Sequence, residues 1–259
     1  SDQTSEAENG IARADQFVGL PVPEVYSSDL SEFIFAAGVK LMQRDRPDIL
    51  YLSTTDYIQH KHAPGTPAAN DFYTMMDGYL AELDGLGCLI ALTADHGMNA
   101  KHLEDGSPDV LYLQDVLDDW SIDARVVLTI TDPYVVHHGA LGSFCTVYLS
   151  GNADADVIAD KIRDLDGVLA VYSRAEGCAE FELPEERMGD LIVISEKHKV
   201  LGSSADSHDL SGLTEPLRSH GGITEQRVPL LINRPASGLA EDRRLRNFDI
   251  FDIALNHAQ

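Results

Sequence analysis

Residues 88–97, Cys-Leu-Ile-Ala-Leu-Thr-Ala-Asp-His-Gly, join an apolar run to two polar residues and a glycine. The run over 88–94 predicts a buried β-strand. Asp95 and His96 follow where that strand ends, and burying two such side chains without partners would be costly. Gly97 permits a sharp turn that lets both face one site. The stretch predicts a strand with chemistry at its carboxyl end, although an ordinary turn with both side chains satisfied is the alternative.

Upstream of this strand the chain predicts a helix, a short strand and a second helix. Residues 29–41 have a helical apolar spacing, with Asp29 as the expected N-cap. Residues 49–52 predict a short buried strand, and Asp56 follows its end. A second helical face, formed by Phe72, Met75, Met76, Tyr79, Leu80 and Leu83, leads to the strand over 88–94. This β-α-β order predicts a parallel sheet with both polar stretches at one edge.

Downstream the pattern changes to short strands around one helix. Strands are predicted over 126–130, 144–149, 168–172 and 191–194, with a helix over 154–165. A strand over 228–232 and a final helix over 249–256 follow. We expect an α/β fold, a mostly parallel sheet flanked by helices, with a smaller inserted α+β cap. The predicted divisions are 1–106 and 206–259 for the catalytic core and 107–205 for the cap.

Composition excludes several classes of partner. The 259 residues include 43 acidic and 19 basic side chains, a net charge of −24, which argues against nucleic acid and anionic membrane surfaces. A solvated acidic surface is the simplest explanation. Three cysteines and the lack of a signal-like N-terminus favour a reduced, cytoplasmic setting. A homodimer is compatible with the sequence.

Five candidate metal ligands lie in three short stretches of the chain: Asp56 and His60, Asp95 and His96, and His220. The four-residue spacing of the first pair would place both side chains on one face of a helical turn. Mixed carboxylate and imidazole ligands suit zinc better than magnesium or calcium. Five ligands exceed what one catalytic zinc needs, so two zinc ions are expected, which usually indicates hydrolysis or transfer at phosphorus. Taken singly, each stretch could be an ordinary polar loop.

Three further histidines are candidates for binding substrate. His62 lies two residues beyond a candidate ligand and could reach a substrate carboxylate, or it could be a solvated loop residue. His137 and His138 lie in the predicted cap. Adjacent side chains on a strand point in opposite directions, so at most one of these two is expected to face substrate.

Four stretches of the chain together resemble the alkaline phosphatase superfamily, and within it the phosphonoacetate hydrolases. They are 51–65 (YLSTTDYIQHKHAPG), 92–98 (LTADHGM), 132–143 (DPYVVHHGALGS) and 215–222 (EPLRSHGG). The resemblance implies an alkaline-phosphatase-like fold. It also implies that Asp56, His60 and His220 bind one zinc, and that Asp95 and His96 bind the other.

The resemblance implies that an organophosphonate is the substrate and that the C–P bond of phosphonoacetate is hydrolysed to acetate and phosphate. In the superfamily the second zinc also has an Asp ligand from the first strand and a threonine nucleophile. Neither has a counterpart here, so the catalytic nucleophile is not assigned. The chain as given is expected to be inactive and to hold at most one zinc tightly. The alternatives are another phosphodiesterase or phosphomonoesterase of the superfamily, or a non-catalytic metal-binding fragment.

Overall fold

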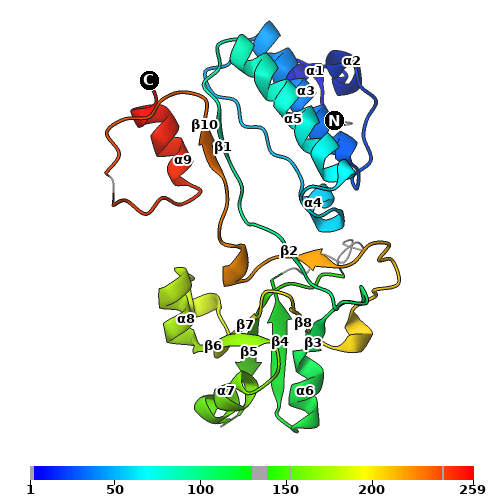
Figure 1. The fold of residues 1–259 in the computed structure, drawn as a ribbon, viewed down its shortest axis with the longest axis vertical. Coiled ribbons are helices and arrows are strands. Elements are labelled where there is room, and N and C mark those ends of the chain that lie inside the picture. The colour runs from blue at the N-terminus through cyan, green and yellow to red at the C-terminus, as the bar shows by residue number, and fades with distance from the viewer. Residues whose placement is uncertain (1–2, 130–138, 152, 241) are drawn as a thin grey trace. The chain divides into compact units, whose positions relative to one another are not determined.

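The computed structural model describes residues 3–129, 139–151, 153–240 and 242–259 (Figure 1). The chain divides into two compact units, residues 1–95 with 229–259 and residues 96–228. The predicted cap, 107–205, lies within the second unit, and its functional separation from a catalytic core stays a prediction. In the described ranges, no helix combines the length and the apolar character that a bilayer crossing would need. All three cysteines are free thiols.

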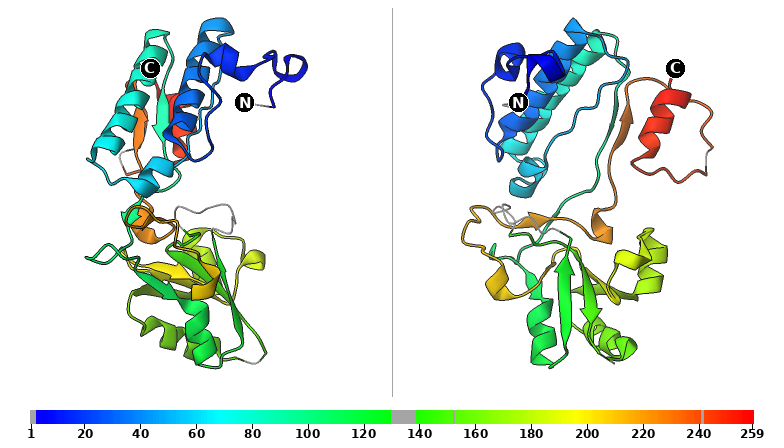
Figure 2. Two further views of the ribbon diagram at one scale, coloured as in Figure 1. Left: turned by 90° about the vertical axis from the view of Figure 1, so that its right-hand side faces the viewer. Right: turned by 180° about the vertical axis from the view of Figure 1, so that it is seen from behind.

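Two long helices dominate the first unit. They are α3 (Ser28–Arg44) and α5 (Pro67–Gly85), which lie side by side in every view (Figure 1, Figure 2). Both predicted helices are confirmed, but the expected cap is wrong, because Ser27 is the N-cap and Asp29 lies in the first turn. Short helices α1 (Glu6–Asn9) and α2 (Ala14–Val18) precede them, and α2 buries apolar residues against α3. The same unit contains α4 (Tyr57–Lys61), α9 (Asp249–Asp252) and the π-helical turn η4 (Ile253–His257).

The strand predicted over 88–94 is present as β1 (Ala91–Thr93), and the strand predicted over 228–232 as β10 (Leu230–Ile232). The two pair with each other in antiparallel register, so the parallel sheet expected from a β-α-β order is not formed by these strands. The strand predicted over 49–52 is wrong. These residues form no ladder in the described part of the chain, and the side chains of Ile49 and Tyr51 are both 76% exposed. A strand exists only through hydrogen bonds to a neighbour, so an apolar run alone does not make one.

The second unit is built on a four-stranded antiparallel sheet of order β4-β5-β7-β6. Its strands are β4 (Ala124–Leu128), β5 (Phe144–Leu149), β6 (Val168–Ser173) and β7 (Leu191–Ser195), close to the predicted ranges. Helices α6 (Leu113–Asp119), α7 (Ala155–Arg163) and α8 (Arg174–Phe181) cover it. Two small sheets complete the unit, parallel β3 (Val110–Tyr112) with β8 (Val200–Gly202), and antiparallel β2 (Asn99–Ala100) with β9 (Arg218–Ser219). Single 3-10 turns are η1 (Glu185–Arg187), η2 (Ala205–Ser207) and η3 (Ile223–Glu225).

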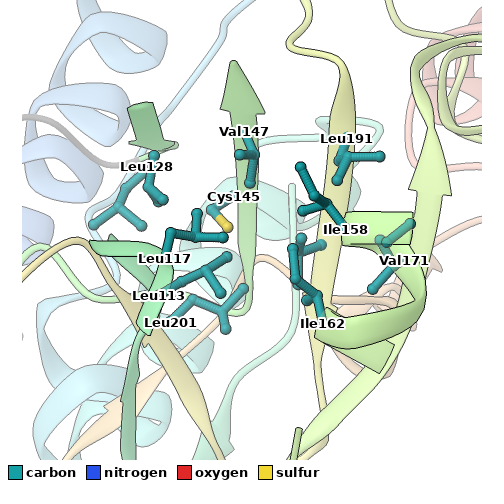
Figure 3. Packing of buried hydrophobic residues seen from close by; sticks show 13 residues of the cluster. Leu113, Leu117, Leu128, Cys145, Val147, Ile158, Ile162, Val171, Leu191 and Leu201 are labelled. Atoms are coloured by element: carbon teal, nitrogen blue, oxygen red, sulfur yellow. The ribbon is translucent and has the colours of Figure 1, made fainter. Parts of the chain in front are cut away.

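The core of the second unit lies between this sheet and helices α6 and α7 (Figure 3). Leu117 from α6 and Ile162 from α7 are fully buried there against β5 and β7. Side chains alternate between the faces of a strand, so Leu191 and Val193 of β7 face this core, while Ile192 and Ile194 pack against α8 on the other face. Burial on both faces explains why β7 is a continuous apolar run. The α/β fold class is confirmed.

Candidate metal-binding and catalytic site

In the first unit, one helical turn brings together the first pair of candidate ligands. Asp56 is the N-cap residue of α4, and His60 lies one turn later. The Nε2 atom of His60 is 3.0 Å from Oδ2 of Asp56. The His60 side chain is 1% exposed and the Asp56 side chain 39% exposed, so the pair lies at the edge of solvent. The predicted one-face arrangement is confirmed.

The 3.0 Å distance between His60 Nε2 and Asp56 Oδ2 is close to the distance between two ligands of one zinc ion. Two ligands that are each ~2.1 Å from a tetrahedral zinc lie roughly 3.4 Å from one another. Asp56 and His60 therefore need to move apart by only about a few tenths of an ångström for both to reach one ion. Without metal, the Nε2 proton of His60 can hydrogen-bond to the carboxylate.

Asp95 lies two residues beyond the end of β1, close to where the predicted strand placed it. The end of β1 is fixed by pairing of Thr93 with Leu230 and by a 2.9 Å hydrogen bond from the Thr93 hydroxyl to the carbonyl oxygen of Pro229. The Asp95 side chain is exposed to solvent. Its position suits a ligand that must be reached from outside the fold.

In the second unit, the imidazole rings of His96 and His220 stack face to face. Their centroids are 3.5 Å apart and their planes differ by 5°. His220 follows β9 directly, and His96 precedes β2 by a short turn, so the pairing of Asn99 with Ser219 brings the two stretches together. The two rings therefore lie side by side although their residues are far apart in the sequence.

One hydrogen bond sets the tautomer of His96. Its Nδ1 atom lies 3.0 Å from the carbonyl oxygen of Gly97, which can only accept. Nδ1 must therefore carry the proton, which places the ring's lone pair on Nε2. A backbone carbonyl that orients a ligating imidazole in this way is common at metal sites. Sequence inspection had not assigned this role to Gly97.

The sequence analysis missed a buried ion pair in the same unit. Lys101 is fully buried, Glu225 is 2% exposed, and Lys101 Nζ lies 3.1 Å from Glu225 Oε1. The two residues are 124 positions apart, so no local spacing could reveal the contact. Their isolated charges in the sequence would ordinarily be assigned to the surface.

The remaining candidates are less constrained. His62 is the half-buried C-cap residue of α4, and its backbone N–H donates to the carbonyl oxygen of Ile58 at 2.8 Å. His137 and His138 lie outside the described residues. The grouping of Asp56 and His60 with His220, and of Asp95 with His96, joins the two units and stays a prediction.

The donor atoms suit zinc. Both ligand-bearing stretches of the first unit offer carboxylate oxygens, and His60, His96 and His220 offer imidazole nitrogens. Magnesium and calcium sites are built from oxygen ligands, whereas zinc accepts this mixture. The residues present therefore fit the metal that the motifs imply.

Comparisons with known proteins agree with the motifs. A family model described as type I phosphodiesterase / nucleotide pyrophosphatase matches residues 9–222. Structures of phosphonoacetate hydrolase from Sinorhizobium meliloti 1021, solved with phosphonoformate and with phosphonoacetate, are 58% and 59% identical to this chain, each with a TM-score of 0.92. Each match covers 98% of this chain and 62% of the solved chain.

Two further relatives are more limited. Phosphonoacetate hydrolase of Penicillium oxalicum is 57% identical over 42 residues, 15% of this chain and 58% of the relative. Murine ectonucleotide pyrophosphatase / phosphodiesterase 5 is 16% identical with a TM-score of 0.53, over 84% of this chain and 55% of that one, and shares the fold alone. The resemblance to the alkaline phosphatase superfamily is confirmed. Because the family model matches well over half of its residues, the chain belongs to the type I phosphodiesterase / nucleotide pyrophosphatase family.

Proposed function

We propose that the protein carrying this chain is a zinc-dependent hydrolase that cleaves the C–P bond of phosphonoacetate to give acetate and phosphate. The observation that carries the proposal is 58% identity, over 98% of this chain, to a phosphonoacetate hydrolase solved with a phosphonate bound. That enzyme's chain is longer, and this chain spans 62% of it. The candidate metal ligands of both units support the same reaction class.

We assign the ligands in two groups. Asp56, His60 and His220 would hold one zinc, in support of which Asp56 and His60 already meet at 3.0 Å. Asp95 and His96 would contribute to the second. They are neighbours in sequence at the end of β1, and His96 stacks on His220, so ligands of both ions come from one small region of the chain.

The chain's own residues prepare this site. When bound, two zinc ions supply charge stabilisation for the phosphonyl oxygens and lower the pKa of an attacking hydroxyl. Hydrogen bonding to Gly97 keeps the His96 lone pair on Nε2. Burial of the His60 ring restricts its motion, so it is held in a single orientation beside Asp56.

Breaking a C–P bond leaves the electron pair on carbon. In phosphonoacetate that carbanion lies next to the substrate's carboxylate, which can delocalise the charge as an enediolate. A hydrogen-bond donor at the carboxylate would stabilise this charge as it develops. We propose His62 for this role, because it is half-buried and lies just past the helical turn that carries His60. His137 and His138 are further candidates by sequence.

Hydrolysis of a nucleotide phosphodiester is the second candidate, because the family model takes its name from that activity. The two reactions differ in their leaving group. A diester releases an alcohol, so an active site for it needs room for a nucleoside and does not need to stabilise a carbanion. A donor placed for a carboxylate would not help such a substrate.

The test is turnover by the native zinc-loaded protein, measured as release of inorganic phosphate from phosphonoacetate and from a simple phosphate monoester, and as release of the alcohol from a nucleotide diester. We expect phosphonoacetate to have the highest kcat/KM. His220→Ala should abolish turnover, while His198→Ala, a matched change at an exposed histidine of the same unit, should leave it unchanged. Faster turnover of the diester or the monoester would overturn the assignment of substrate.

A further inference from the structure

The buried ion pair of the second unit has every ammonium proton engaged. Nζ of Lys101 donates to the Ser143 hydroxyl at 2.6 Å, to the carbonyl oxygen of Lys197 at 2.8 Å and to the Glu225 carboxylate at 3.1 Å. Lys101 and Ser143 are both 0% exposed. Burial lowers the pKa of Lys101 below its ordinary value, and the neighbouring Glu225 charge opposes that effect. The ammonium is therefore a fixed junction between three segments of the chain.

The carboxylate is equally well satisfied. Oε1 of Glu225 accepts from the Asn99 amide at 2.5 Å and from the Thr224 hydroxyl at 2.6 Å. Oε2 accepts from the backbone N–H of Gly222 at 2.9 Å, two residues beyond His220. Each hydrogen bond to a charged acceptor is stronger than a neutral one. The loop that follows His220 is thus tied directly to the ion pair.

Backbone contacts carry this constraint to both histidines. The N–H of Gly97 donates to the carbonyl oxygen of Glu225 at 2.6 Å, immediately after His96. The N–H of Ser143 donates to the carbonyl oxygen of His220 at 2.8 Å. The residues that meet Lys101 through their side chains therefore also hold the backbone at both stacked rings.

Stability alone is a poor explanation for this arrangement. Apolar side chains of similar volume often replace a buried ion pair without loss of stability. This network is hydrogen-bonded to both loops that carry candidate metal ligands. It can therefore fix the positions of those ligands, which a metal site requires to within a fraction of an ångström. Close packing points the same way, since a Cβ built at Gly222 would lie 2.8 Å from Ser143 Cβ and 3.1 Å from Glu225 Oε2.

The geometry points to Lys101, Glu225 and Ser143 as positioning residues that hold His96 and His220 in the stacked arrangement in which they bind metal. They touch no reacting atom. They act through the peptide groups beside the two imidazoles. This inference rests on the proposed function, because that function requires both histidines as zinc ligands.

The test compares Lys101→Met, Ser143→Ala and a control, Thr146→Val. Thr146 lies in β5 of the same unit, and its buried hydroxyl bonds only to the backbone at Leu191 and Gly189 among the contacts described for it. The first readout is the NMR signals of the two imidazoles in the metal-free protein. The second is the affinity for Zn²⁺ alone, measured against a competing chelator. Thermal unfolding reports the general loss of stability.

Lys101→Met should shift both imidazole signals and weaken Zn²⁺ binding by about 10- to 100-fold, the usual effect of losing a residue that orients a ligand. Ser143→Ala, which removes one hydroxyl, should give a smaller change in the same direction and decides the matter if Lys101→Met does not fold. Thr146→Val should lower the unfolding temperature and leave both readouts unchanged. Wild-type signals and affinity in a folded Lys101→Met or Ser143→Ala protein would overturn the inference, as would equal shifts in Thr146→Val.

These outcomes are separable from the substrate assignment. Shifted imidazole signals in a protein that does not hydrolyse phosphonoacetate would overturn the proposed substrate and support the positioning role. Unshifted imidazole signals in the variants of a protein that does hydrolyse phosphonoacetate would overturn the positioning role and support the proposed substrate.

Discussion

Gly97 lies where the turn carrying His96 presses against the backbone of the η3 region, and replacing it with alanine should disrupt that contact. A Cβ built there would lie 3.1 Å from the carbonyl oxygen of Glu225 and 3.2 Å from that of Arg227, and both distances are shorter than the ordinary contact range of 3.4–4 Å. Both atoms belong to the backbone and cannot rotate away. The turn must therefore move by a few tenths of an ångström, and overpacking of this kind costs about 1–3 kcal/mol.

The assay for Gly97→Ala is urea unfolding followed by the fluorescence of Trp120, the single tryptophan of the chain, which packs against the core of the same unit. Zn²⁺ affinity should fall together with stability, because the displaced turn carries His96. Gly78→Ala is the matched control. Gly78 is exposed within α5 with no atom within 4 Å of a built Cβ, so alanine there should stabilise the helix by about 0.5–1 kcal/mol. A Gly97→Ala protein within about 0.5 kcal/mol of wild type, with unchanged Zn²⁺ affinity, would refute the reasoning.

Three further predictions concern the core, the acid limit of stability and the substrate carboxylate. Ile162→Ala should destabilise the second unit by about 2–5 kcal/mol in tryptophan-monitored unfolding, while Val157→Ala, 55% exposed on the same helix, should change it by no more than about 0.5 kcal/mol; similar losses would contradict the core assignment. Burial raises the pKa of Glu225, but hydrogen bonds and a neighbouring positive charge outweigh it and lower that pKa below its ordinary value. The Glu225 carboxylate therefore stabilises the fold above its unfolded pKa, and this contribution is lost as pH falls through the folded pKa. Glu225→Gln should make the free energy of unfolding depend less on pH in the acid range. An unchanged acid dependence would contradict this. His62→Gln should raise KM for phosphonoacetate and lower kcat, His198→Gln should alter neither, and equal effects would remove His62 from the site.

Elements with a strong local pattern were predictable from the sequence. The helical spacing of α3 and α5 and the continuous apolar run of β7 each reflect burial that a few neighbouring residues can satisfy. The run at 49–52 is just as apolar, yet it forms no ladder in the described residues. The antiparallel pairing of β1 with β10 depends on residues roughly 140 positions apart, which no local pattern encodes.

The candidate site divides in the same way. The contact between Asp56 and His60 follows from their spacing on one helical turn, so it could be predicted from sequence. The stacking of His96 on His220 needs strand pairing between distant segments, so the sequence could group the two as candidate metal ligands but could not predict that their rings stack. The ion pair of Lys101 with Glu225 has neither a local pattern nor a motif, because its partners are 124 residues apart in the sequence.

The assignment of five ligands to two metal ions is tested most directly by diffraction from the native protein with zinc, with anomalous data collected at the zinc absorption edge. We expect two anomalous peaks ~3.5–4 Å apart. One should lie ~2.1 Å from ligand atoms of Asp56, His60 and His220. The other should lie at the same distance from Asp95 and His96. A single peak, or a zinc ion bound by His220 without Asp56 and His60, would contradict the assignment.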